Sequence, residues 1–133
     1  MPSGRPRSDD DALSRRDMGL EFLDVTAQVR TELIQSNSRG GGRQEDVYRV
    51  TNNSSSIIDA HLLMIARGIS DQVQLENGSG ITSTGHYPYL RVFLPDGVLL
   101  PGQSIVQTLS FRRRPQAPPV SYVLTLLSGQ GKP

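Results

Sequence analysis

The side chains that could take part in catalysis or metal binding are few and lie far apart in the sequence. There are two histidines, His61 and His86, and no cysteine. Nucleophilic catalysis requires a nucleophile, a base and an orienting group, yet no Gly-x-Ser-x-Gly pattern occurs, and neither histidine lies near a Ser and an Asp in a recognisable arrangement. A zinc site needs several His or Cys ligands at short spacing. The sequence therefore predicts no catalytic residues, no metal site and no cofactor.

Calcium and phosphate sites are not predicted either. Most acidic residues are isolated and lack the Asp-x-Asp-x-Asp spacing of a calcium loop, and the cluster Asp9–Asp11 lies in a segment whose composition is typical of a solvated tail. Gly78 and Gly80 are followed by no Gly-Lys-Ser/Thr motif and open no helix. These glycines indicate a hairpin turn and not a phosphate-binding loop.

Two short segments carry side chains suited to ligand contact. The candidate sugar or anion contacts are His86, Tyr87, Tyr89, Arg112, Arg113 and Arg114. Exposed aromatic rings stack on the faces of sugars, although the position of Tyr89 beside Leu90 in a predicted strand also fits burial. The three arginines could bind a sulfated or phosphorylated polymer, and the alternative is an ordinary solvated run of charge.

Length and charge limit the class of protein. A chain of 133 residues is the size of one domain. The net charge of +1 gives no electrostatic basis for a nucleic-acid partner. The longest apolar run, Leu62–Ala66, is far shorter than the roughly 20 residues of a membrane helix, and residues 1–20 lack the apolar core of a signal peptide. We therefore expect no nucleic-acid partner, no membrane insertion and no signal peptide in this sequence.

Apolar and polar residues alternate from Leu23 to Leu33, and this period of two predicts a half-buried strand. Three consecutive glycines, Gly40–Gly42, then favour a hairpin, and the returning strand ends at the polar cluster Asn52–Ser56. The expected organisation is a disordered tail or linker at residues 1–18, one domain at residues 19–129 and a frayed end at residues 130–133.

The remaining chain shows turn signals every ten or so residues, as in an all-β sandwich. Further strands are predicted at Ile57–Arg67, Tyr89–Phe93, Ser104–Phe111 and Val120–Leu126. Short connections favour antiparallel pairing. The predicted core comprises Val50, Leu62, Met64, Leu75, Ile105, Leu109, Phe111, Tyr122 and Leu124. The fold class expected from these patterns is an antiparallel β-sandwich of about seven strands.

The motif order resembles the immunoglobulin-like (fibronectin-III-like) modules that bacteria append to secreted hydrolases and cell-surface proteins. The similarity runs from about Val25 to Gly129 through VTNNSSSIIDAHLLMIARGI, VQLENGSG, HYPYLRV, LLPGQSIVQTLSF and YVLTLLSG. In that family Val-Thr-Asn-x-Ser ends an early strand, Pro-Gly-Gln-Ser leads into a late strand and Ser-Gly closes the last one. These motifs are structural, so the resemblance implies an immunoglobulin-like sandwich and no catalytic site.

The sequence departs from the family at two places. Val106 is out of phase with its apolar neighbours, and a bulge near this residue would restore the alternation. Leu63 and Ile65 fall on the face of their strand that normally meets solvent. One interpretation is a protein interface formed by His61, Leu63, Ile65 and Arg67; the other is a bulge that turns both apolar residues into the core.

The function expected from these observations is that of a non-catalytic accessory module of a larger secreted or surface protein, acting in domain spacing, adhesion or protein-protein contact. Its expected partners are neighbouring domains or another protein, with weak self-association and polysaccharide contact as further expectations. The alternative is a carbohydrate-binding module that uses exposed Tyr87 and Tyr89. The expected location is extracellular or at the cell surface.

Overall fold

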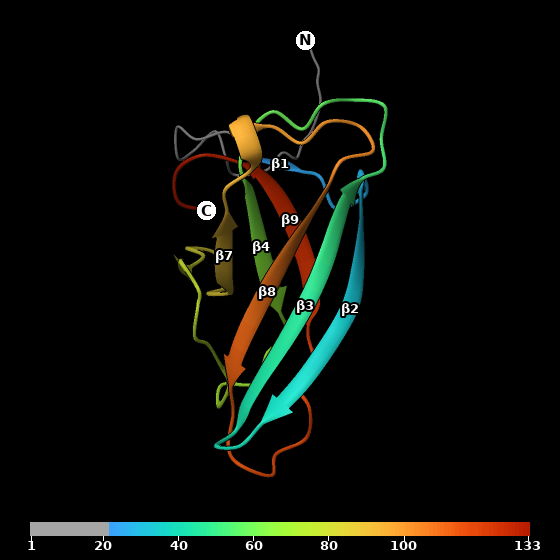
Figure 1. Ribbon diagram of the computed structural model, residues 1–133. Helices are drawn as coiled ribbons and strands as arrows, with labels where there is room; N and C mark the ends of the chain where they lie inside the picture. The colour runs from blue at the N-terminus through green and yellow to red at the C-terminus, as the bar shows by residue number, and fades with distance from the viewer. Residues whose placement is uncertain (1–21) are drawn as a thin grey trace.

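The computed structural model describes residues 22–133, so the predicted tail at residues 1–18 lies outside the described residues. Within the described part, nine strands form two antiparallel sheets that pack as a sandwich (Figure 1). The five-stranded sheet has the order β1-β9-β4-β7-β6 and the four-stranded sheet the order β2-β3-β8-β5. The strands are β1 (Phe22–Asp24), β2 (Val29–Arg39), β3 (Arg43–Asn52), β4 (Leu62–Arg67), β5 (Gln74–Leu75), β6 (Gly80–Ile81), β7 (Pro88–Val92), β8 (Ser104–Arg112) and β9 (Val123–Gly129).

The predicted all-β antiparallel sandwich is confirmed. The described residues contain more strands than the seven or so expected, and two of the nine, β5 and β6, are only two residues long. Short strands of this kind leave almost no alternation to detect in the sequence. A single turn of 3-10 helix, η2 (Pro95–Gly97), lies between β7 and β8.

An apolar core fills the space between the two sheets. Five of the residues predicted to form it are fully buried: Val50, Leu62, Met64, Leu109 and Phe111. The other four, Leu75, Ile105, Tyr122 and Leu124, are partly buried and pack against this core. Burial of one large apolar side chain contributes roughly 1.5–3 kcal/mol. The layer between the sheets is therefore the main source of stability.

The segment predicted as one strand from Leu23 to Leu33 is divided between the two sheets, so that prediction is wrong. A turn separates β1 from β2, and Asp24 Oδ1 accepts a hydrogen bond from the backbone N–H of Thr26 at 2.9 Å. The alternation continues through the turn because Val25 and Val29, which flank it, are both buried in the same core. A turn that keeps the apolar residues at every second position cannot be recognised from the alternation alone.

The predicted bulge near Val106 is also absent, because β8 pairs with β3 in unbroken register. Val106 faces solvent with 58% exposure, while the half-buried Gln107 takes the inner position and donates its side-chain N–H to the carbonyl of Thr108 at 3.2 Å. A register shift instead lies in β2, where Ile34 is the additional residue. β2 is an edge strand, and edges tolerate such shifts more readily than central strands.

The predicted strand Ile57–Arg67 begins only at Leu62, because Asn52 fixes a loop before it. The buried side-chain amide of Asn52 donates to the carbonyls of Ser56 at 2.8 Å and of Leu99 at 2.9 Å. Ile58 then pairs with Leu99 in an isolated bridge. The polar cluster that was expected to end β3 thus also shapes the chain that follows it.

Leu63 and Ile65 face away from the core between the sheets and are nevertheless buried. β4 keeps an unbroken register with both of its neighbours, so no bulge turns these residues inward. Their exposed fractions are 0% and 6%, because they form a second apolar cluster on the outer face of the five-stranded sheet. The other members of this cluster are the buried Phe22 and Tyr89 and the partly buried Tyr87 and Leu127. The chain itself therefore covers the two residues.

We expect Leu109→Ala to lower the free energy of unfolding by about 2–5 kcal/mol, because it removes fully buried methyl groups and leaves a cavity. Val106→Ala, on the exposed face of the same strand, is the matched control and should change it by about 0.5 kcal/mol or less. Urea denaturation measures both variants. Equal losses would show that the inner and outer faces of β8 are assigned wrongly.

We expect the double variant Leu63→Ser with Ile65→Thr to lose about 2 kcal/mol or more, because it places hydroxyl groups in a buried apolar cluster. Chemical denaturation measures the loss, and sedimentation of the wild-type chain at high concentration measures self-association. A double variant of unchanged stability that no longer self-associates would instead place both residues at an interface between chains.

Candidate functional site

One end of the sandwich, which we call the distal end, is formed by the β2–β3 hairpin, residues 68–73 after β4 and residues 113–122 before β9. β3 and β8 extend past β4 and β9 here, and the connection that follows β8 closes the gap (Figure 1). The backbone N–H of Arg113 donates to the carbonyl of Gly42 at 2.8 Å. Only glycine fits at this position, because its φ is 84° and a Cβ would lie 1.9 Å from the carbonyl oxygen of Arg113.

A buried carboxylate ties the connection to β3. Asp46 is 3% exposed, and it accepts hydrogen bonds from the hydroxyls of Ser36 and Tyr122, both at 2.6 Å. The side-chain amide of Gln44 donates to both carboxylate oxygens at 3.1 Å, and its oxygen accepts the backbone N–H of Val120 at 3.0 Å. No cation among the described residues pairs with Asp46. Neutral donors therefore stabilise this carboxylate.

Two tyrosines extend this network toward the core. The hydroxyls of Tyr48 and Tyr122 lie 2.6 Å apart, and the ring of Tyr122 packs on Phe111 with 4.9 Å between centroids. Burial raises the pKa of Tyr122 far above its usual range, and its hydrogen bonds to Asp46 and Tyr48 raise it further. Burial also raises the pKa of Tyr48, with the charge of Asp46 adding to the effect and the hydrogen bond to Tyr122 opposing it. Both phenols therefore resist ionisation more than an exposed tyrosine does.

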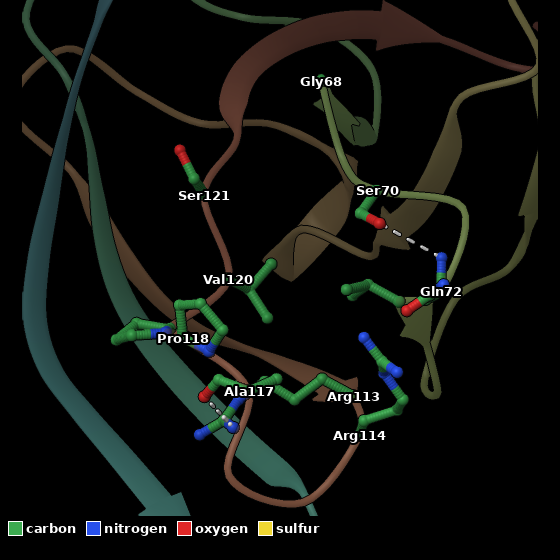
Figure 2. A pocket seen from close by; sticks show the side chains of 11 residues that line it. Gly68, Ser70, Gln72, Arg113, Arg114, Ala117, Pro118, Val120 and Ser121 are labelled. Carbon is green, nitrogen blue, oxygen red and sulfur yellow. Dashed lines mark hydrogen bonds between the residues drawn. The ribbon is translucent and has the colours of Figure 1, made fainter.

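A half-open pocket of about 400 Å³ lies between residues 68–73 and residues 113–121 (Figure 2). Apolar side chains form part of its wall, among them Val73, Val120 and two consecutive prolines, Pro118 and Pro119. Its polar lining includes Ser70, Gln72, Ser121, Arg113 and Arg114. The pocket therefore combines hydroxyl, amide and guanidinium groups with apolar surface, a composition typical of small-ligand sites.

The three arginines predicted as anion contacts have different roles. Arg112 is paired with Glu76, whose Oε2 lies 2.7 Å from its Nε. Arg113 donates to the carbonyl of Ala117 at 2.7 Å and to Ser38 Oγ at 3.3 Å, and its Nε is buried without a hydrogen-bond partner in the described chain. The guanidinium of Arg114 has no partner among residues 22–133 and points into the pocket (Figure 2). Arg114 is therefore the cation available to a ligand.

The three predicted aromatic contacts do not share an exposed surface. His86 is exposed with a φ of 53°, Tyr87 is half-buried and Tyr89 is only 5% exposed. The ring of Tyr89 lies against Gly80, where a Cβ would be 2.8 Å from its hydroxyl oxygen. None of the three residues lines the pocket. A sugar therefore cannot stack on Tyr89 in this structure.

The four residues predicted as an interface are spread along β4 and its flanks. His61 Nδ1 accepts the backbone N–H of Leu94 at 2.9 Å, and its ring meets the edge of Phe93 at 5.0 Å. Arg67, the last residue of β4, is exposed at the distal end. Since Leu63 and Ile65 between them are buried, the four do not form one exposed patch, and a partner at this strand stays a prediction.

Sequence reasoning did not identify the carboxylate network or the polar lining of the pocket. A signal for the network was present, because Gln44 and Asp46 alternate in phase with Tyr48 and Val50 and so fall on the inner face of their strand. Polar residues at core positions are expected to be hydrogen-bonded and to hold neighbouring segments. No such signal exists for Ser70, Gln72 and Ser121, which meet only because two loops converge.

No protein-family model matches the chain, and no curated protein matches it either. Residues 22–133 contain no group of three or more His, Cys, Asp or Glu side chains placed to hold a metal ion. The described part also contains no helix long and apolar enough to cross a membrane. The immunoglobulin-like resemblance thus rests on the sequence motifs, while the two-sheet sandwich rests on the structure.

We expect the free energy of unfolding to fall as the pH rises above about 10, the ordinary pKa of tyrosine. Folding raises the pKa of Tyr48 and Tyr122, so at high pH the unfolded chain binds fewer protons than the folded chain, and stability decreases with pH. Tyr122→Phe should flatten this dependence, whereas Tyr87→Phe, outside the network, should retain it. Urea denaturation from about pH 8 to about pH 11 tests this, and the same slope in all three proteins would contradict it.

Proposed function

We infer that this chain makes its contacts through the end of the sandwich opposite its two connections. The described chain enters and leaves the sandwich at the same end. Phe22, the first described residue, pairs with Gly129, the last residue of β9. We call this the proximal end. β9 has seven residues, and at about 3.3 Å per residue it separates Gly129 from Val123 and the distal loops by roughly 20 Å. The pocket and the hairpin therefore lie opposite the two points at which the sandwich connects to the rest of the chain.

We propose that this chain is a non-catalytic, immunoglobulin-like accessory module of a larger secreted or surface protein, and that it acts in adhesion or protein-protein contact through its distal end. The observation that carries this proposal is the pairing of Phe22 with Gly129, since neighbours joined there leave the distal end free. A module that spaces domains apart is better served by attachment points at opposite ends. Contact is therefore favoured over spacing.

The arrangement of the acid-base side chains supports a non-catalytic role. Asp46 accepts hydrogen bonds that fix the connection before β9, and His61 accepts the one that fixes the chain at Leu94. Groups held in this way maintain the positions of loops, and both are satisfied by neighbouring residues of the fold. The sandwich thus uses these side chains to build a rigid frame for its loops.

The alternative, a carbohydrate-binding module that stacks sugars on Tyr87 and Tyr89, is not favoured by the geometry. A stacking platform requires exposed ring faces. Tyr89 is 5% exposed and belongs to the apolar cluster around Leu63, against which Tyr87 also packs. Contact through these two rings would require the cluster to open.

Cell fractionation tests the proposed role and location. An antibody raised against the folded chain should detect a protein larger than 133 residues in the culture supernatant or the cell-envelope fraction. Antibody pre-absorbed with the pure chain and an intracellular marker protein are the controls. A band of the size of the 133-residue chain, confined to the intracellular fraction, would contradict the proposal.

A further inference from the structure

Two arginines line the pocket without a carboxylate partner among the described residues, and of these Arg113 is already hydrogen-bonded to Ala117 and Ser38. Three ion pairs engage the neighbouring charges: Arg39 with Glu45 at 3.0 Å, Arg43 with Glu76 at 3.7 Å, and Arg112 with Glu76 at 2.7 Å. No acidic residue lines the pocket, and Asp71, in the loop that forms one wall, is exposed. Arg114 therefore has no carboxylate from the described chain to neutralise it.

The groups around Arg114 suit a ligand that carries hydroxyls. Ser70 presents a hydroxyl, and Gln72 presents an amide with both donor and acceptor atoms. The backbone N–H of Gln72 donates to Ser70 Oγ at 3.3 Å, which fixes this part of the wall (Figure 2). Val120 and Pro118 supply apolar surface opposite. The lining thus combines polar and apolar side chains on both of its walls.

The connection that holds Arg114 is anchored on both sides. Before it, Arg113 donates to the carbonyl of Gly42 from its backbone and to the carbonyl of Ala117 from its side chain. After it, Val120 donates to Gln44 and Tyr122 donates to the buried Asp46. A cation presented on a loop fixed in this way loses less conformational freedom on binding, which favours affinity.

We propose that this pocket binds a hexuronate unit of an acidic polysaccharide, with the carboxylate on the guanidinium of Arg114 and the ring hydroxyls on Ser70 and Gln72. The planar fork of an arginine matches a carboxylate through two parallel hydrogen bonds. A volume of about 400 Å³ lies within the range of about 300–1,000 Å³ for small-ligand pockets. The sugar enters edge-on, with its apolar face toward Val120.

Other anionic partners fit this pocket less well. A nucleic acid presents a phosphate every few ångströms and is held by many cations, whereas two arginines line this pocket and one of them, Arg113, is already held by Ala117 and Ser38. An acidic peptide offers one acceptor and at most one donor per backbone unit, whereas the ring of a hexuronate offers several neighbouring hydroxyls to Ser70 and Gln72. The combination of one free cation with a hydroxyl and an amide therefore favours a sugar acid.

Hexuronate binding would specify the partner in the proposed contact role of the distal end. It rests on that role only because the distal end must be free in the native protein. The experiment uses the whole 133-residue chain in solution, so its result is independent of cell fractionation. Calorimetry measures binding of an oligogalacturonate, and amide NMR maps it. The control ligand is the same oligosaccharide with methyl-esterified carboxyls, which lacks the negative charge. Poly-glutamate and inorganic sulfate test whether negative charge alone is enough for binding.

We expect saturable binding of the oligogalacturonate with amide shifts confined to residues 68–73 and 113–121. Arg114→Gln should weaken it at least about tenfold, the loss typical of a charge-assisted hydrogen bond. Arg114→Lys keeps the charge but loses the planar guanidinium, so its affinity should lie between those of the wild type and Arg114→Gln. Arg30→Gln removes the same charge near the opposite end of β2, where Arg30 pairs with Glu32 at 3.0 Å, and should bind as the wild type does.

Several results would overturn the inference. They are the absence of saturable oligogalacturonate binding, equal binding of the methyl ester, and equal binding by Arg114→Gln when its melting temperature matches that of the wild type. Binding of poly-glutamate or sulfate as tight as that of the oligogalacturonate would also overturn it, because the hydroxyl contacts would then contribute nothing.

Discussion

The two sheets of this sandwich differ in length, and the distal end depends on that difference. β3 has ten residues and β8 nine, whereas β4 has six and β9 seven. Two sheets of equal length would cover each other's inner faces completely. Here the inner face of β3 near the hairpin has no strand opposite it, so the connection between β8 and β9 must cover it. A loop that covers a core needs partners for its backbone groups.

Asp46 and Gln44 supply those partners from the strand itself. Both residues are in phase with the core positions Tyr48 and Val50, so their side chains point inward where the opposite sheet has ended. A buried carboxylate is costly unless donors surround it, and here Ser36, Gln44 and Tyr122 provide them. The same hydrogen bonds fix the residues that follow the pocket-lining arginines. Because the buried carboxylate requires hydrogen-bond donors, it holds Tyr122, and Gln44 of the same network holds Val120. These hydrogen bonds fix the loop and, with it, one wall of the pocket.

The outer face of the five-stranded sheet is covered by its own side chains. Parallel or fully covered sheets are apolar on both sides, whereas an antiparallel sheet usually turns a polar face to water. In β4 the outward residues Leu63 and Ile65 are apolar, and they are buried with the rings of Phe22 and Tyr89, from β1 and β7 of the same sheet. The aromatic residues that a sugar-binding surface would need are thereby used inside the fold. In the role that we propose, the contact surface is therefore the distal end with its arginine-bearing loops.

The sequence by itself determined the fold class and most of the core, because period-two alternation reports which face of a strand is buried and residues such as Leu62, Met64 and Leu109 follow it. It also indicated that Arg112, Arg113 and Arg114 could meet an anion, but not that only Arg114 is unpaired, because Glu76 and Ala117 approach the other two through the fold. The break after β1 kept the phase of the alternation, so only strand pairing could reveal it. The burial of Tyr89 and the pocket between residues 68–73 and 113–121 likewise depend on segments distant in sequence, and local patterns carry no information about such contacts.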